Sequence, residues 1–190
     1  MTDREVLISL MENSEGEFPS NWGSDMPIDK WEGVTTNEEG CVIELFLSHI
    51  DSLSSDIGNL TNLTELRIGG CIFLSSLPES IGNLMNLTTL RLVACHSLTS
   101  LPSSIGDLTN LKKLVLIGGH SLTSLPESIG GLSNLEELYL AHCNIDYLPH
   151  ELEKLTKLKK ISLIGDSLCN VAIPETLCSR CEVIREEQLG

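Results

Sequence analysis

A pattern that recurs every 24 residues constrains this chain more strongly than any other feature of its sequence. Complete copies of the pattern begin at Leu63, Leu87, Leu111 and Leu135. A degenerate copy precedes them and a truncated copy follows them. Leucine is the commonest residue, while aromatic residues make up only 4% of the chain. This composition favours a repeat architecture over an ordinary globular core.

Each complete copy opens with L-x-x-L-x-L and closes with L-P-x-x-I-G-x-L or a variant of it. The L-x-L alternation has the period of two that predicts a β-strand with one buried face. Proline suits the start of a helical turn, and we expect the glycine to let the chain turn out of it. One copy cannot bury its own row of leucines, so successive copies must stack with parallel strands around a continuous core.

The full pattern, L-x-x-L-x-L-x-x-C-x-x-L-x-x-L-P-x-x-I-G-x-L, resembles the leucine-rich repeat family. It is most similar to the repeats of plant disease-resistance proteins and of intracellular plant leucine-rich repeat proteins. The resemblance implies an α/β fold, namely a right-handed, horseshoe-shaped solenoid. Its curved parallel β-sheet, of about six strands, is expected to line the concave face.

We divide the chain into an N-terminal cap (1–41), six repeats (42–168) and a C-terminal cap (169–190). The repeats start near residues 42, 63, 87, 111, 135 and 158. Residues 1–41 resemble the N-terminal cap of plant-type and microbial members of the family. Both caps are expected to cover the ends of the leucine core, since a stack of repeats leaves two apolar ends exposed.

Apolar residues suited to this task occur in both caps. In the first cap, Leu7, Leu10 and Met11 share one face of a predicted helix. Their expected companions at that end are Trp22, Trp31 and Val34. The opposite cap offers Ile173, Leu177, Val183 and Ile184.

Acidic residues outnumber basic residues by 27 to 12, which gives a formal net charge of −15. Nucleic acids and anionic membranes attract basic surfaces, so this balance argues against both as partners. No apolar run is long enough for a membrane span, and the N-terminus lacks a secretory signal. Secreted plant relatives usually carry a cysteine pair in the N-terminal cap that is missing here. We therefore expect a cytoplasmic protein with reduced thiols.

Outward-facing strand positions supply the candidate binding residues, because alternate side chains of a strand leave the core. The apolar residues expected to stand together on this solvent-facing surface are Val93, Val115, Ile117 and Tyr139. Arg67 and Arg91 adjoin them. Clustered exposed apolar residues often mark interaction sites, although β-propensity alone also places such residues on strands. With two residues at its margins, the predicted site comprises Phe46, Arg67, Arg91, Val93, Val115, Ile117, Tyr139 and His142.

These residues suggest a protein partner that presents an apolar stripe with an acidic edge. Lys113, Glu137 and Lys160 alternate in sign across neighbouring strands. They form either a surface charge ladder of little energetic weight or a pattern that a partner reads. We expect a monomer rather than an oligomer, although the apolar cluster would also serve self-association.

Six of the seven cysteines fall into two groups. Cys71, Cys95 and Cys143 share one repeat position. In the family this position holds Asn or Cys and points inward, so buried structural thiols are expected. Cys169, Cys178 and Cys181 cluster near the C-terminus. Free thiols, a disulfide and an incomplete metal site all remain open for this second group.

The sequence contains no motif that indicates catalysis. It has no Walker loop, no G-x-G-x-x-G and no H-E-x-x-H. His96 and His120 occupy equivalent positions in adjacent repeats, as surface residues of the loops or as half of a metal site. We therefore expect neither an enzyme nor a bound metal or cofactor.

The function favoured by the sequence is a non-catalytic protein–protein interaction module that binds its partner on the concave sheet, in signalling or defence. The first alternative is an extracellular receptor or inhibitor fragment that binds a peptide or carbohydrate. It predicts glycans at the sequons of Asn59, Asn62 and Asn86. The second alternative is an enzyme, or the targeting arm of an enzyme, and it requires a catalytic domain, for which the repeats and caps leave no room within these 190 residues.

Overall fold

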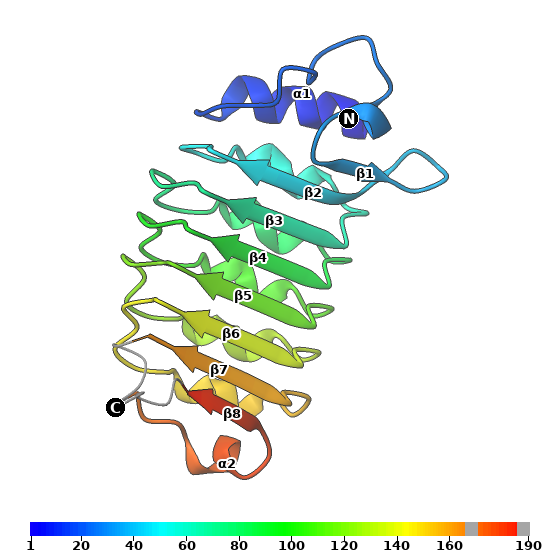
Figure 1. The fold of residues 1–190 in the computed structure, drawn as a ribbon. Helices are drawn as coiled ribbons and strands as arrows, with labels where there is room; N and C mark the ends of the chain where they lie inside the picture. Colours follow the sequence, from blue (N-terminus) through cyan, green and yellow to red (C-terminus); the bar gives the residue numbers. More distant parts are fainter. Residues whose placement is uncertain (166–170, 186–190) are drawn as a thin grey trace.

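A computed structural model describes residues 1–165 and 171–185. Parallel strands form one side of the stack and short 3₁₀ turns form the other, as Figure 1 shows. The predicted repeats contribute the strands β2 (Val42–Ser48), β3 (Glu65–Gly69), β4 (Thr89–Val93), β5 (Lys113–Ile117), β6 (Glu137–Ala141) and β7 (Lys160–Ile164). Two further strands lie outside the repeats, β1 (Val34–Thr36) and β8 (Glu182–Arg185).

One open sheet runs through the molecule in sequence order from β1 to β8. Strands β2 to β8 are parallel, and β1 pairs with β2 in the antiparallel sense. The expectation of a leucine-rich repeat solenoid is confirmed, and its sheet gains one strand at each end beyond the six expected. Equivalent repeat positions lie side by side, so that Arg67 of β3 is in register with Arg91 of β4.

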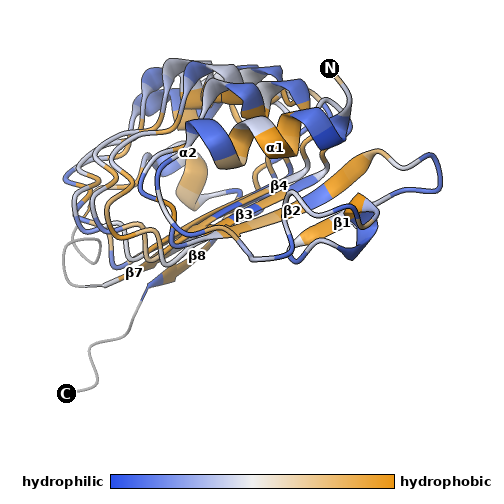
Figure 2. Ribbon diagram, turned by 90° about the horizontal axis from the view of Figure 1, so that it is seen from above, coloured by the Kyte–Doolittle hydropathy of each residue, from blue (hydrophilic) through white to orange (hydrophobic). Residues whose placement is uncertain are grey.

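The leucines of the pattern fill the space between the sheet and the turns. Leu66, Leu90, Leu114 and Leu138 are completely buried at one such position in four successive repeats. Figure 2 looks along the stack and shows the repeats superposed, with α1 covering the near end. Each repeat therefore completes the apolar environment of its neighbours, as stacking requires.

Short 3₁₀ turns form the side opposite the sheet: η2 (Ser55–Asn59), η3 (Glu79–Asn83), η4 (Ser103–Asp107), η5 (Glu127–Gly131) and η6 (His150–Lys154). A proline stands directly before each of the last four turns. This agrees with the expected start of a helical turn, because proline has a suitable φ and lacks an N–H group that would go unpaired.

The glycine of the turn has a different role from the expected one. Gly82 and Gly106 are absent from the residues with positive φ, so they do not turn the chain out of the helix. A Cβ atom on Gly106 would lie 2.2 Å from the carbonyl oxygen of Ser128 in the next turn. The glycine is needed because successive turns approach each other too closely for a side chain.

Asparagine side chains link successive repeats near the ends of these turns. The Nδ2 atom of Asn86 donates a hydrogen bond to the carbonyl oxygen of Thr61 at 2.9 Å. Asn110 donates in the same way to Met85, and Asn134 to Thr109. Each of these bonds reaches back to the preceding repeat and satisfies one of its carbonyl groups.

The N-terminal residues cover the first repeat. Helix α1 (Asp3–Asn13) begins with a capping box in which the side chains of Thr2 and Glu5 accept hydrogen bonds from each other's backbone N–H groups. Leu7 and Leu10 are buried and Met11 is half-buried, as the helical pattern predicted. The other predicted members of this apolar group are also buried, namely Trp22, Trp31 and Val34. A 3₁₀ turn, η1 (Ile28–Lys30), lies between the two tryptophans.

A short helix, α2 (Glu175–Cys178), lies at the opposite end. Leu177 is completely buried there, while Ile173, Val183 and Ile184 are half-buried. The apolar residues expected at this end therefore contribute to different extents. The boundaries of the caps and repeats given above stay predictions.

The residue two positions after the last inward leucine or isoleucine of a strand adopts a left-handed conformation in every repeat. Glycine occupies this position in three repeats, where φ is +66° at Gly70, +70° at Gly118 and +116° at Gly165. His49, Ala94 and His142 hold φ values of 56°, 54° and 52° at the equivalent positions. A side chain is strained in this region, whereas glycine is not.

We predict that Ala94→Gly raises the free energy of unfolding by about 1 kcal/mol because it removes this strain, and that Gly118→Ala lowers it by a similar amount. Urea unfolding measures both changes. Ala141, which lies within strand β6, is the matched control, since Ala141→Gly is expected to destabilise the protein. Equal destabilisation by Ala94→Gly and Ala141→Gly would contradict this explanation.

Candidate functional site

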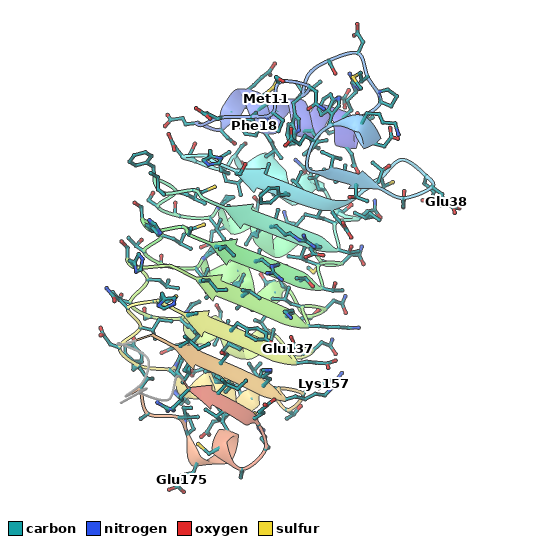
Figure 3. The ribbon with its side chains drawn as sticks, viewed as in Figure 1. Met11, Phe18, Glu38, Glu137, Lys157 and Glu175 are labelled. Atoms are coloured by element: carbon teal, nitrogen blue, oxygen red, sulfur yellow. The ribbon has the colours of Figure 1, made fainter. Side chains whose placement is uncertain are left out.

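The outward-facing surface of the sheet, called here the sheet face, is turned toward the viewer in Figure 3. Because the strands are in register, the middle outward residue of each strand lies beside its counterpart on the next strand. This central row consists of Phe46, Arg67, Arg91, Val115, Tyr139 and Ser162. A second row, two residues further along each strand, includes Gly69, Val93 and Ile117.

A hollow of about 290 Å³ opens on the sheet face over β2, β3 and β4. We call it the sheet-face pocket, and its lining residues are Phe46, Arg67, Ile68, Gly69, Arg91 and Val93. Four of the eight predicted site residues therefore meet in it. Gly69 makes room for it, because a Cβ atom there would lie 3.5 Å from the ring of Phe46. The sequence analysis did not identify Gly69, although neighbouring strands carry larger residues at this position.

Two arginines line the sheet-face pocket, and they differ in their ion pairing. The Nε atom of Arg67 lies 2.7 Å from Oε1 of Glu65, and this hydrogen bond raises the pKa of Arg67. No carboxylate in the described part of the chain lies within ion-pairing distance of Arg91, which is half-buried. Two like charges on adjacent strands repel each other. An anionic group placed between them would relieve this repulsion.

The expected apolar patch is less continuous than the sequence suggested. Val115 was expected to face solvent, but only 3% of its surface is exposed. It lies between the longer side chains of Arg91 and Tyr139 on the adjacent strands, and it does not belong to the main core. Neighbouring strands are only about 4.8 Å apart, so long side chains can cover a short one. Val115 therefore supports its neighbours instead of offering a contact surface.

The remaining predicted site residues lie outside the sheet-face pocket. Ile117 and Tyr139 are half-buried on β5 and β6. Lys113 and Lys160 approach the Tyr139 ring, with their Nζ atoms 4.8 and 5.7 Å from its centroid. His142 is exposed after the end of β6. The structure thus separates the predicted site into a pocket at one end and a tyrosine between two cations at the other.

The alternating charges interact only in part as expected. Lys113 Nζ lies 2.8 Å from Oε2 of Glu137, which is labelled in Figure 3, and this contact lowers the pKa of Glu137. Lys160 pairs instead with Glu182 of β8, at 3.9 Å. The final strand, which the sequence pattern did not reveal, therefore supplies the last acidic member of the ladder.

The inward cysteines are structural. Cys71, Cys95 and Cys143 are buried, and their thiols donate hydrogen bonds to backbone carbonyl groups. Burial raises the pKa of Cys143, whereas the interaction with the neighbouring Cys95 side chain lowers the pKa of Cys71 to about 7. A reactive cysteine requires exposure as well as a low pKa, and Cys71 is completely buried.

Near the C-terminus, Cys178 is exposed and Cys181 is buried, and both are free thiols. Cys169, the third member of this group, lies outside the described residues. The rings of His96 and His120 lie 4.9 Å apart. Within residues 1–165 and 171–185, no three side chains of His, Cys, Asp or Glu come together in a way that would hold a metal ion.

A second hollow lies outside the sheet face, in the loops that follow β2 and β3. Its volume is about 520 Å³, and Ile72 and Phe73 are exposed beside it. The sequence analysis overlooked both residues. Comparison of the repeats does distinguish them, because the next two repeats have His-Ser at the same positions.

Comparison with known proteins agrees with this architecture. The family described as "Leucine-rich repeat region" matches residues 41–183. No curated protein sequence matches the chain. Among the described residues, no helix has the length and apolar character needed to cross a membrane.

Three solved structures illustrate the likeness. A leucine-rich repeat protein of Leptospira interrogans is 37% identical, with a TM-score of 0.57 over 67% of this chain and 33% of that one. The PEPR1–AtPEP1 structure is 22% identical, with a TM-score of 0.68 over 95% of this chain and 27% of that one. The BIR3–SERK2 complex of Arabidopsis thaliana is 22% identical, with a TM-score of 0.57 over 80% of this chain and 88% of that one. The chain spans about a third or less of the first two structures.

We predict that a thiol reagent modifies Cys178 quickly in the native protein, while Cys71, Cys95 and Cys143 react only after unfolding, because burial prevents access whatever the pKa. Peptide mass spectrometry after brief labelling at pH 8 identifies the modified residues. Labelling of the unfolded protein is the control. Rapid native labelling of Cys71 would show that its lowered pKa, and not its burial, determines its reactivity.

Proposed function

We propose, from the premise that this chain belongs to the leucine-rich repeat family, that it is a non-catalytic module that binds a protein partner on its sheet face. The family fold is a general protein-interaction module, and its members in the solved structures include protein complexes. The proposed binding site is the sheet-face pocket. Signalling or defence is the proposed context, on the strength of the resemblance to plant disease-resistance repeats.

One observation carries the choice of this surface, namely that Arg67 and Arg91 lie side by side on adjacent strands and line the same hollow. The chain has a net charge of −15, yet two cations stand next to each other on adjacent strands. Arg91 makes no ion pair within the described residues. Arginine is enriched at the energetic centres of interfaces because its planar group binds carboxylates in a bidentate manner.

The apolar lining of the pocket defines the second property of the partner. Phe46 is 47% exposed, and Val93 lies on the other side of Gly69. Covering this surface would stabilise a complex, because apolar area would leave water. The proposed partner segment therefore presents an apolar side chain next to an acidic one, and it binds a preformed rigid surface.

We predict that Arg67→Glu/Arg91→Glu weakens capture of the partner from a lysate of the source organism by about tenfold or more, because it replaces attraction with repulsion. Quantitative mass spectrometry of the captured proteins measures this. Lys30→Glu/Lys154→Glu makes the same change in net charge at two exposed residues away from the sheet face. Equal retention by both variants would remove the sheet-face pocket from the proposal.

An extracellular receptor fragment is the second candidate, favoured by the exposed sequon residues Asn59, Asn62 and Asn86. We propose the cytoplasm instead, and the free thiols support this choice.

The two locations are distinguished by the mass of the protein purified from its own source. We predict an unglycosylated chain in which thiol titration finds every cysteine reduced, because the cytoplasm maintains thiols. The recombinant chain from a bacterial cytoplasm is the reference. Hexose-containing mass at any of the three asparagines would instead establish the secretory pathway and support the second candidate.

A further inference from the structure

The hollow in the loops after β2 and β3 differs from the sheet-face pocket in position and in charge. We call it the loop groove. It is lined by Gly16, Glu17, His49, Asp51, Gly70, Ile72 and Phe73. The strands end toward these loops, which lie along the edge of the stack to which the arrows in Figure 1 point. None of its lining residues belongs to the sheet-face pocket.

The N-terminal segment supplies one wall of the loop groove and is held firmly in place. The backbone N–H of Glu17 donates to the carbonyl oxygen of His49 at 3.0 Å, and that of Asp51 donates to Glu15 at 2.6 Å. Between them, a Cβ atom on Gly16 would lie 2.4 Å from Cα of Ile50. The wall is therefore a close backbone contact, so the groove exists before any partner arrives.

Two exposed apolar residues form the other wall. Ile72 is 46% exposed and Phe73 is 65% exposed. The next repeats place His96–Ser97 and His120–Ser121 at the same positions, so the solenoid does not require apolar residues there. Adjacent exposed apolar side chains that the core does not need indicate an interaction surface.

Carboxylates lie beside this apolar wall. Glu17 is exposed and Asp51 is half-buried. In the described part of the chain, neither carboxylate makes an ion pair or a hydrogen bond. The groove thus combines an apolar contact area with unneutralised negative charge.

We propose that the loop groove binds a segment of a second protein in which a large apolar side chain stands next to a lysine or arginine. The apolar side chain packs against Ile72 and Phe73, and the cation lies near Glu17 and Asp51. This is the reverse of the charge proposed for the sheet-face pocket. The chain therefore has two surfaces that select opposite charges, and the second one does not depend on the first.

Selection from a phage-displayed library of random dodecapeptides on the immobilised full chain tests this proposal. Ile72→His/Phe73→Ser is the main variant, because the chain itself tolerates this pair in the next two repeats. Glu17→Gln/Asp51→Asn removes the charges alone. Arg67→Glu/Arg91→Glu is the matched control, since it alters the other site and leaves the groove intact. Circular dichroism and urea unfolding establish that each variant is folded.

We expect a class of selected peptides that pair a large apolar residue with Lys or Arg. As synthetic peptides they are expected to bind Ile72→His/Phe73→Ser about tenfold or more weakly, Glu17→Gln/Asp51→Asn about threefold more weakly, and the arginine variant without loss. Absence of this class, or its undiminished binding to Ile72→His/Phe73→Ser, would overturn the proposal. Peptides lost only with the arginine variant would support the sheet-face pocket and count against the loop groove.

Discussion

The stacking of inward leucines in register is the interaction on which the rest of the structure depends. No repeat encloses its own apolar residues, so each one is stable only between neighbours that present the same residues at the same height. That requirement places Leu66, Leu90, Leu114 and Leu138 in line. It also places the outward residues in line, because successive side chains of a strand point to opposite faces. The sheet face is thus organised by the core behind it.

This dependence explains how much could be predicted from the sequence. Strand positions, buried cysteines and the proline before each of the turns η3 to η6 follow from the repeated pattern, since each recurs at a nearly constant spacing. β1 and β8 do not carry the pattern and were missed as strands. The prediction that Val115 faces solvent was wrong. Its exposure depends on the lengths of the side chains on the two neighbouring strands, and the sequence of a single repeat does not contain those side chains. Gly69, Ile72 and Phe73 were overlooked because they differ from the residues at the same positions of neighbouring repeats, whereas the repeat pattern contains only what the repeats share.

The net charge of the chain does not show how its charged residues are distributed over the repeats. Much of the acidic excess lies in residues 1–40, and within the repeats the central row of the sheet brings Arg67 and Arg91 together. On the next two strands, Lys113 forms an ion pair with Glu137 and also approaches the ring of Tyr139. The sheet face therefore has a region where Arg91 has no ion-pair partner among the described residues and a region of balanced charge. Such local contrast favours one orientation of a bound segment over its reverse.

The asparagine bonds between repeats have a consequence for the order in which the chain folds. Asn86, Asn110 and Asn134 each donate to a carbonyl group of the preceding repeat. That repeat is synthesised first. A new repeat therefore meets its acceptors already in place, on a template that begins with the capped helix α1. Folding can therefore begin at the N-terminal end, but a repeat is complete only once the next one has stacked on it, since the backbone N–H of Ala94 donates to the carbonyl oxygen of Ile117 in the following repeat. Each new repeat of the solenoid is thus added to the repeat that precedes it in the chain.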